Sequence, residues 1–138
     1  MTALEPQAPG TPTGAHSAAA EPYWEGCRQG ELRYQRCGEC HEVNMKPASS
    51  CAACGAAALT WERSAGRGRL YSWTVVWRPQ HPSFQVPYAP AIIELDEGFW
   101  LMSAIVGCDH EDLRVDMPVV IEFHPASDDT VLPYFRPF

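Results

Sequence analysis

Four cysteines form two closely spaced pairs that have the chemistry of a metal site. Cys37 and Cys40 are separated by two residues, and after a gap of ten residues Cys51 and Cys54 repeat the same spacing. Two thiolates spaced in this way at a tight turn can occupy two corners of a tetrahedron, each about 2.3 Å from a zinc ion. Two such turns supply four thiolate ligands and leave no coordination position for water or substrate. The spacing therefore predicts one structural Zn²⁺ ion held by these four residues.

The spacing of the cysteines alone does not exclude other functions for them. Iron can bind the same four thiolates, and a redox dithiol needs only one Cys-x-x-Cys pair. His41 lies beside the first pair and is expected at the surface, because the thiolates already fill the site. Cys27 and Cys108 lie outside the pairs, and we expect them to pack as small hydrophobic side chains.

The elements that must position this site are short strands. Residues 32–36 and 59–63 alternate like strands on either side of the cysteine pairs. Residues 21–31 favour a short helix, since proline suits its first turn and acidic residues suit its N-terminus. After residue 66 the sequence is rich in β-branched and aromatic residues and predicts five short strands, at residues 70–77, 91–95, 99–106, 118–123 and 131–135.

These patterns predict a mostly β fold in two parts. We expect an N-terminal short helix and zinc ribbon over residues 21–66, followed by a small closed barrel over residues 67–138. The five-stranded OB-fold is the leading candidate for the barrel. Residues 1–20 are mostly Ala, Pro, Thr and Gly, so we expect a disordered tail or a linker there.

Composition indicates the cellular compartment in which we expect the protein. No apolar run approaches the length of about 18 residues that a membrane helix needs, so we expect no membrane segment. The first 20 residues lack the basic start and apolar core of a secretory signal, which predicts a cytoplasmic protein. In that reducing compartment six cysteines suggest metal ligands or free thiols rather than disulfides.

A set of short motifs occurs in a fixed order between residues 21 and 138. They are Pro22-Tyr23-Trp24-Glu25-Gly26, Gly30-Glu31-Leu32, the two cysteine pairs, Gly66-Arg67-Gly68-Arg69-Leu70-Tyr71-Ser72-Trp73-Thr74, Pro87-Tyr88 and Leu132-Pro133-Tyr134-Phe135-Arg136-Pro137. Together they resemble the acyl-CoA-associated OB-fold family with an N-terminal rubredoxin-like zinc ribbon, long known as a domain of unknown function. One position departs from the pattern, because members often carry Gly where this chain has Asp116, just before a strand.

The resemblance implies a function in acyl-CoA chemistry. Members of that family are usually partners of thiolase-like enzymes, and some complete an aldolase that cleaves side chains from steroid-CoA thioesters. Others are fused to a hydratase-like domain. We therefore expect an accessory subunit, without catalysis alone, in a hetero-oligomer that is an acyl-CoA carbon–carbon lyase or acyltransferase. Such a subunit would dock on a thiolase fold, help to form the CoA-thioester site and serve lipid metabolism, with steroid degradation as one branch.

Five residues are candidates for contacts with CoA. Lys46, Arg67 and Arg69 are the candidate phosphate ligands, if a cleft between ribbon and barrel brings them together. The alternative is that they are solvated surface charges. Phe84 and Tyr88 lie on a long proline-rich loop, and long loops in compact domains are often functional. They are candidates to meet an acyl chain or a partner, unless the loop folds back on its own barrel.

Aromatic residues near both ends of the ordered chain are candidates for a partner interface. Tyr23 and Trp24 lie on the short helix, and Phe135 and Phe138 lie at the C-terminus. Exposed apolar patches of this kind mark interaction sites. The alternative is that these side chains pack on their own domain or close the barrel.

Two other classes of function compete with the accessory subunit. A single-stranded nucleic-acid binder is one, because OB-folds and zinc ribbons serve that role and Trp73, Trp77 and Phe84 are candidate stacking platforms. The net charge of −7 argues against it, since nucleic-acid binding needs a basic surface. A self-sufficient enzyme is the other, but no carboxylate at a telling spacing supports His81 or His124 as a base.

Overall fold

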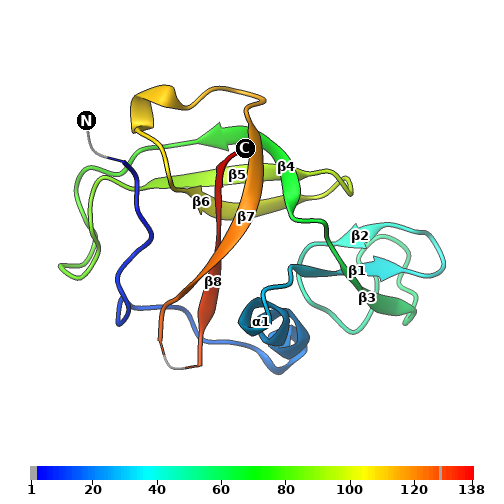
Figure 1. The fold of residues 1–138 in the computed structure, drawn as a ribbon. Coiled ribbons are helices and arrows are strands. Elements are labelled where there is room, and N and C mark those ends of the chain that lie inside the picture. Colours follow the sequence, from blue (N-terminus) through cyan, green and yellow to red (C-terminus); the bar gives the residue numbers. More distant parts are fainter. Residues whose placement is uncertain (1–2, 128) are drawn as a thin grey trace.

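The computed structural model describes residues 3–127 and 129–138 (Figure 1). The described chain contains a 3₁₀ turn and a short helix near its start, then a run of strands interrupted by one more 3₁₀ turn. In order they are η1 (Ala18–Ala20), α1 (Glu21–Arg28), β1 (Arg33–Cys37), β2 (Val43–Asn44), β3 (Leu59–Arg63), β4 (Arg67–Trp73), β5 (Ala89–Leu95), β6 (Trp100–Ile105), η2 (His110–Asp112), β7 (Pro118–Pro125) and β8 (Val131–Pro137).

The strands form two sheets that meet at residues 64–66. The first is a three-stranded sheet in the order β2-β1-β3, and the second is a closed barrel in the order β4-β5-β6-β8-β7. Neighbouring barrel strands are antiparallel except β6 and β8, which run parallel. The predicted mostly β fold with a closed five-stranded barrel is confirmed. In Figure 1 the small sheet lies to one side of the barrel, with α1 packed below both.

One hydrophobic core joins the ribbon to the barrel. Leu70 and Ile93 are fully buried inside the barrel, because inward and outward side chains alternate along its strands. Leu32 and Tyr34 from the ribbon side belong to the same cluster of buried residues. The Tyr34 ring lies 4.7 Å from the ring of Phe99, measured between centroids. The ribbon is therefore not a separate folding unit with its own core, because it shares the hydrophobic core of the barrel.

Two backbone positions explain how the barrel closes. A Cβ atom on Gly68 would lie 2.3 Å from the carbonyl oxygen of Glu94, so only glycine lets β4 approach β5 this closely. Asp116 has a φ of 65°, in the left-handed region that favours glycine. Aspartate tolerates that region better than most residues. This chain thus keeps the turn before β7 with Asp116, at a position where the resemblance leads one to expect glycine.

The N-terminal segment differs from the predicted disordered tail. Leu4 is 2% exposed and belongs to the hydrophobic core. Its N–H donates to the carbonyl of Cys108 at 2.7 Å, and its carbonyl accepts from the N–H of Gly107 at 2.8 Å. A buried leucine with two backbone hydrogen bonds thus helps to anchor a segment whose composition suggests disorder. Residues 1 and 2 of the predicted tail lie outside the described residues.

Leu4→Ala is expected to lower the free energy of unfolding by about 2–4 kcal/mol, because it removes a fully buried leucine side chain from the core. Urea unfolding followed by tryptophan fluorescence measures this change. Thr13→Ala, at an exposed position of the same segment, is the control and should leave the midpoint unchanged. Equal stability of both variants would contradict the packing of Leu4.

The described residues include no helix with the length and apolar character needed to cross a membrane. The α-helix α1 has eight residues.

Candidate functional site

The four predicted zinc ligands come together at the tip of the ribbon. Cys37 ends β1, and Cys40, Cys51 and Cys54 lie on the turns beyond it. All four Sγ atoms lie within 4.8 Å of one another. The Sγ atoms of Cys37 and Cys54 are 3.6 Å apart, as are those of Cys40 and Cys51. Two thiolates of a tetrahedral zinc site are separated by about 3.8 Å, so the donor set fits a zinc ion.

Asn44 is a buried part of this site that the spacing argument missed. Its Nδ2 atom donates to Cys51 Sγ at 3.4 Å, and its Oδ1 atom accepts from the N–H of Ala52 at 2.8 Å. These two bonds fix the second cysteine turn against β2. Residues that hydrogen-bond to metal ligands, without binding the metal themselves, orient those ligands and adjust their affinity for the metal. An asparagine between two cysteine pairs is the sequence signal for this role, but only the fold shows which cysteine it faces.

Hydrogen bonds prepare two of the thiols for metal binding. The amide of Asn44 is the largest cause that lowers the pKa of Cys51, to about 6. Backbone N–H groups of Cys40 and Glu39 lower the pKa of Cys37 below its usual value. Zinc binds the thiolate and not the thiol, so both shifts favour the metal-bound form, whereas burial and the neighbouring cysteines raise the pKa of Cys40 and Cys54 above the usual value.

The zinc at this site is structural. Four thiolates fill its tetrahedron, so no position is left for a water or a substrate. The ion ties the turn after β1 to the turn after β2, in a small sheet whose third strand, β3, is mostly solvent-accessible. The four cysteines thus hold the ribbon in shape, and any contact with a ligand must come from other residues.

The candidate phosphate ligands are not gathered in one cleft. The cleft between ribbon and barrel has a volume of about 400 Å³, and none of Lys46, Arg67 and Arg69 is among its lining residues. The guanidinium of Arg69 lies 2.6 Å from the carboxylate of Glu94, which neutralises its charge. Arg67 lies over the ring of Phe138, 4.5 Å from its centroid. Lys46 is exposed on the ribbon. The three side chains therefore do not meet in this cleft, and their contact with CoA phosphates stays a prediction.

An apolar pocket brings together four other candidates. Tyr23 and Trp24 of α1 line it from one side, and Phe84 and Tyr88 of the proline-rich loop line it from another. Its volume is about 290 Å³. The rings of Phe84 and Tyr88 are stacked, with centroids 5.8 Å apart. Residues assigned separately to CoA and to a partner thus share one pocket, which their positions in the sequence did not indicate. We call it the helix–loop pocket.

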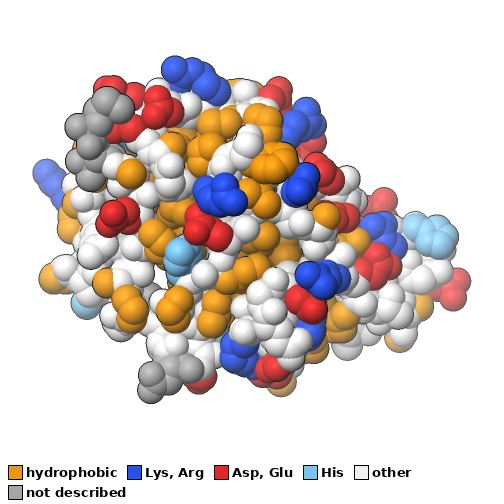
Figure 2. All heavy atoms as spheres, in the orientation of Figure 1, with side chains coloured by type: hydrophobic (Ala, Val, Ile, Leu, Met, Phe, Trp, Pro, Cys, Tyr) orange, Lys and Arg blue, Asp and Glu red, His pale blue; other side chains and the backbone are white. Residues whose placement is uncertain are grey.

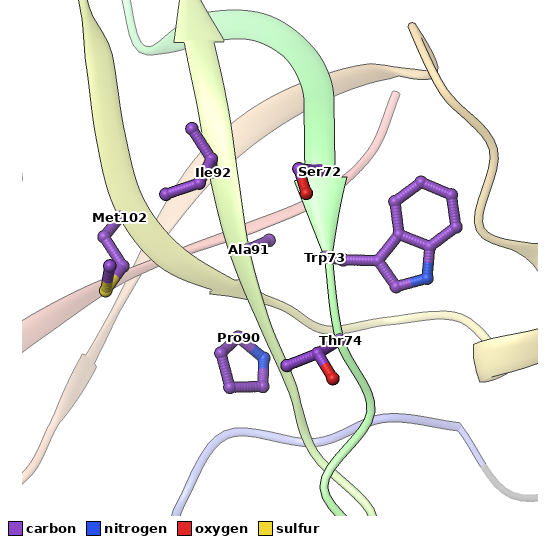
Figure 3. A pocket seen from close by; sticks show the side chains of 7 residues that line it. All are labelled: Ser72, Trp73, Thr74, Pro90, Ala91, Ile92 and Met102. Atoms are coloured by element: carbon purple, nitrogen blue, oxygen red, sulfur yellow. The ribbon is translucent and has the colours of Figure 1, made fainter.

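A second, shallower pocket of about 230 Å³ lies next to it on the outer face of the barrel (Figure 3). Pro90 and Met102 line both pockets. Figure 3 shows Met102 on β6 beside Ile92 on β5, and these two residues are direct partners in the sheet. Met102 is 73% exposed, which is unusual for so apolar a side chain. We call this surface the strand pocket.

The C-terminal aromatic residues lie in different environments. Phe135 is fully buried in the barrel core, so its predicted place in a partner interface is wrong, and closing the barrel is its role. Phe138 is 64% exposed and remains available at the surface. The two side chains differ because Phe135 lies within β8, whereas Phe138 follows Pro137, the last residue of that strand.

Comparisons with known proteins agree with this architecture. A family model described as the rubredoxin-like zinc ribbon domain of ChsH2 matches residues 24–60, and one described as the C-terminal OB-fold domain of ChsH2 matches residues 61–124. A solved structure described as the Ltp2-ChsH2(DUF35) aldolase has a TM-score of 0.83 and 34% identity. That likeness covers 91% of this chain and 98% of the other.

Two curated relatives are subunits of larger enzymes. A probable enoyl-CoA hydratase alpha subunit from Thermomonospora curvata is 36% identical over 115 residues. A 3-oxo-4,17-pregnadiene-20-carboxyl-CoA hydratase alpha subunit from Mycobacterium tuberculosis is 28% identical over 116 residues. The matches cover 83% and 84% of this chain but 36% of each relative. The shared ribbon and barrel show that this chain belongs to the DUF35 family, in the form that joins a ChsH2-type zinc ribbon to an OB-fold.

Proposed function

We propose that this protein is a non-catalytic accessory subunit of a thiolase-like acyl-CoA enzyme, a thiolase or a retro-aldolase. One observation carries the proposal. This chain resembles a chain in the solved structure described as the Ltp2-ChsH2(DUF35) aldolase, and the likeness covers 98% of that other chain. The alpha-subunit relatives act on CoA thioesters by name, and one name contains a steroid-derived acyl group. Steroid side-chain degradation is therefore one setting for the complex, in the cytoplasm.

The described residues support a role without catalysis by this chain alone. The metal site is closed by thiolates. The hydroxyl of Ser83 lies 2.7 Å from His81 Nδ1, but both residues stand in an exposed turn, and the same nitrogen also accepts from the N–H of Ser83. His124 pairs with Glu122 at 2.9 Å on the side of β7. Neither histidine has a nucleophile placed in a closed pocket, as covalent catalysis requires.

We expect the CoA-thioester site to lie at the interface between this chain and its partner subunit. Tyr23, Trp24 and Phe138 are our candidates for contact with that partner. Lys46 and Arg67 stay candidates for the phosphates of CoA, because both side chains are exposed and a partner subunit could complete a site around each of them. Arg69 is a weaker candidate, since a phosphate would have to displace Glu94.

The nucleic-acid alternative is not favoured. Figure 2 shows Lys and Arg side chains interspersed with Asp and Glu side chains on this face, with apolar side chains between them. Residues 67–138 contain five Arg and ten Asp or Glu, a balance of 5 − 10 = −5. A basic stripe that neutralises phosphates is what single-strand binders need.

Co-expression with a thiolase-like protein encoded nearby is expected to give a stable hetero-oligomer. Light scattering on the eluted complex gives its mass, and turnover of a CoA thioester should require both chains. Trp24→Ala is expected to weaken the complex by about tenfold or more, because half-buried tryptophans are frequent hot spots of interfaces. Trp77→Ala, which also removes an accessible indole, is the matched control. If this chain purifies only as a monomer and changes the activity of none of the thiolase-like proteins encoded nearby, the proposal is overturned.

A further inference from the structure

The helix–loop pocket is held open by hydrogen bonds between distant segments. Gln7 Nε2 donates to the carbonyl of Gln85 at 3.0 Å, and the N–H of Gln85 donates to Gln7 Oε1 at 2.8 Å. The N–H of Gln7 donates to the hydroxyl of Tyr134 at 3.2 Å. These bonds tie the N-terminal segment to the proline-rich loop on one side and to β8 on the other. Hydrogen bonds thus join three of the segments that line the pocket.

The walls of the pocket are suited to hydrocarbon. Met102, Ile105 and Leu132 contribute apolar surface from β6 and β8. Two polar side chains in the walls already have partners, since Ser103 Oγ donates to the carbonyl of Pro133 at 2.9 Å and the Tyr88 hydroxyl donates to Gln80 Oε1 at 2.8 Å. A ligand that enters would meet few unpaired donors or acceptors, and it gains free energy mainly by leaving water.

The charge around the pocket disfavours the phosphate groups of CoA. Among the described residues that line it, Glu5 is the one charged side chain. A carboxylate repels phosphate, and no lysine or arginine among these lining residues offsets it. The ligand chemistry that fits is therefore uncharged and apolar.

We propose that the helix–loop pocket binds the hydrocarbon part of an acyl group while the nucleotide of CoA stays outside. The choice of a CoA thioester rests on the proposed function, whereas the preference for an apolar ligand rests on the pocket alone. Its volume of about 290 Å³ lies near the lower end of ordinary ligand sites, so it takes an acyl group rather than a whole thioester. Met102 lines both this pocket and the strand pocket, which Figure 3 shows, and a flexible thioether can adapt its shape to longer acyl groups.

The methionines of the chain provide a direct test. The full chain carries ¹³C in its methionine methyl groups and is titrated with octanoyl-CoA, with free CoA and with octan-1-ol, followed by NMR. Met102 lines the pocket, whereas Met45 lies on the ribbon and Met117 precedes β7. Octanoyl-CoA and octan-1-ol should shift the Met102 signal and leave the Met117 signal in place. Free CoA should leave Met102 unchanged at the same concentration.

A pocket-filling variant sharpens the test. Ala104 lines the pocket, so Ala104→Trp places an indole in the space that the acyl group needs and should weaken octanoyl-CoA binding by about tenfold or more. Val115→Trp adds the same side chain at a position that is 65% exposed, and it should bind like the parent chain. If Ala104→Trp does not fold, the three titrations of the parent chain still decide.

Two results would overturn the inference: no Met102 shift with either octyl ligand, or an equal shift with free CoA. Because these titrations use the chain without a partner, their outcome is independent of complex formation. A chain that binds octan-1-ol but forms no thiolase-like complex would refute the proposed function and leave the pocket assignment standing.

Discussion

Cys51→Ser is expected to abolish zinc binding and to unfold the ribbon. The serine hydroxyl is not ionised at neutral pH, so one of four thiolate ligands is lost together with the hydrogen bond from Asn44. Structural zinc contributes about 10 kcal/mol or more of apparent binding free energy to small domains, and that energy is available only to the folded form. The variant should therefore have the largest effect of any single substitution in this chain.

The shared core makes the effect extend beyond the ribbon. Leu32 precedes β1 and Tyr34 lies within it, and both pack in the cluster that contains Leu70 and Ile93 of the barrel. If β1 unfolds, these two side chains leave the barrel's surface and Phe99 loses its ring partner. We expect the barrel to stay folded with a lower unfolding midpoint, so that the variant shows one weakened transition.

Metal content and stability measure this outcome together. Elemental analysis should find one zinc per parent chain and none in Cys51→Ser, and the urea midpoint should fall in parallel. Cys108→Ser is the matched control, because it makes the same substitution at a cysteine outside the site and should keep its zinc. A Cys51→Ser chain that retains a full zinc content would refute the four-thiolate site. Iron in the parent chain would instead support the alternative metal.

The zinc ligands were predictable because their geometry is local. Two residues between cysteines fix a turn, and the turn fixes where both sulfur atoms point, whatever the rest of the chain does. The barrel strands were predictable for a similar reason, since runs such as residues 91–95 are too apolar and β-branched for a loop. The start of β4 at Arg67, three residues before the predicted strand, was set by its pairing with β7, which no local pattern records.

The features that were missed depend on contacts between distant residues. Leu4 is buried because its backbone bonds to Gly107 and Cys108, more than 100 positions away, so its own neighbours in the sequence gave no sign of it. The ion pair of Arg69, one of the three phosphate candidates, could not be predicted for a similar reason. Arg69 lies opposite Glu94 on the adjacent strand, and cross-strand pairing of opposite charges takes up its guanidinium. Charge is visible in a sequence, whereas the partner that neutralises it is not.

Phe135→Ala is expected to cost about 3–5 kcal/mol of unfolding free energy, whereas Phe138→Ala should cost less than about 1 kcal/mol. The two substitutions are chemically identical and lie three residues apart on one end of the chain. Phe135 is fully buried and opposes Ile121 across β7 and β8, so its removal leaves a cavity in the barrel. Phe138 is largely exposed and loses only its contact with the guanidinium of Arg67.

Urea unfolding of both variants tests the assignment, and binding to the thiolase-like partner gives it functional meaning. If Phe138 belongs to the interface, Phe138→Ala keeps the parent midpoint yet binds the partner more weakly. Phe135→Ala should bind normally at temperatures where it is folded, because its ring faces the core. A loss below about 1 kcal/mol for Phe135→Ala would contradict its burial. Equal binding by both variants would remove Phe138 from the interface and leave α1 as the remaining aromatic candidate.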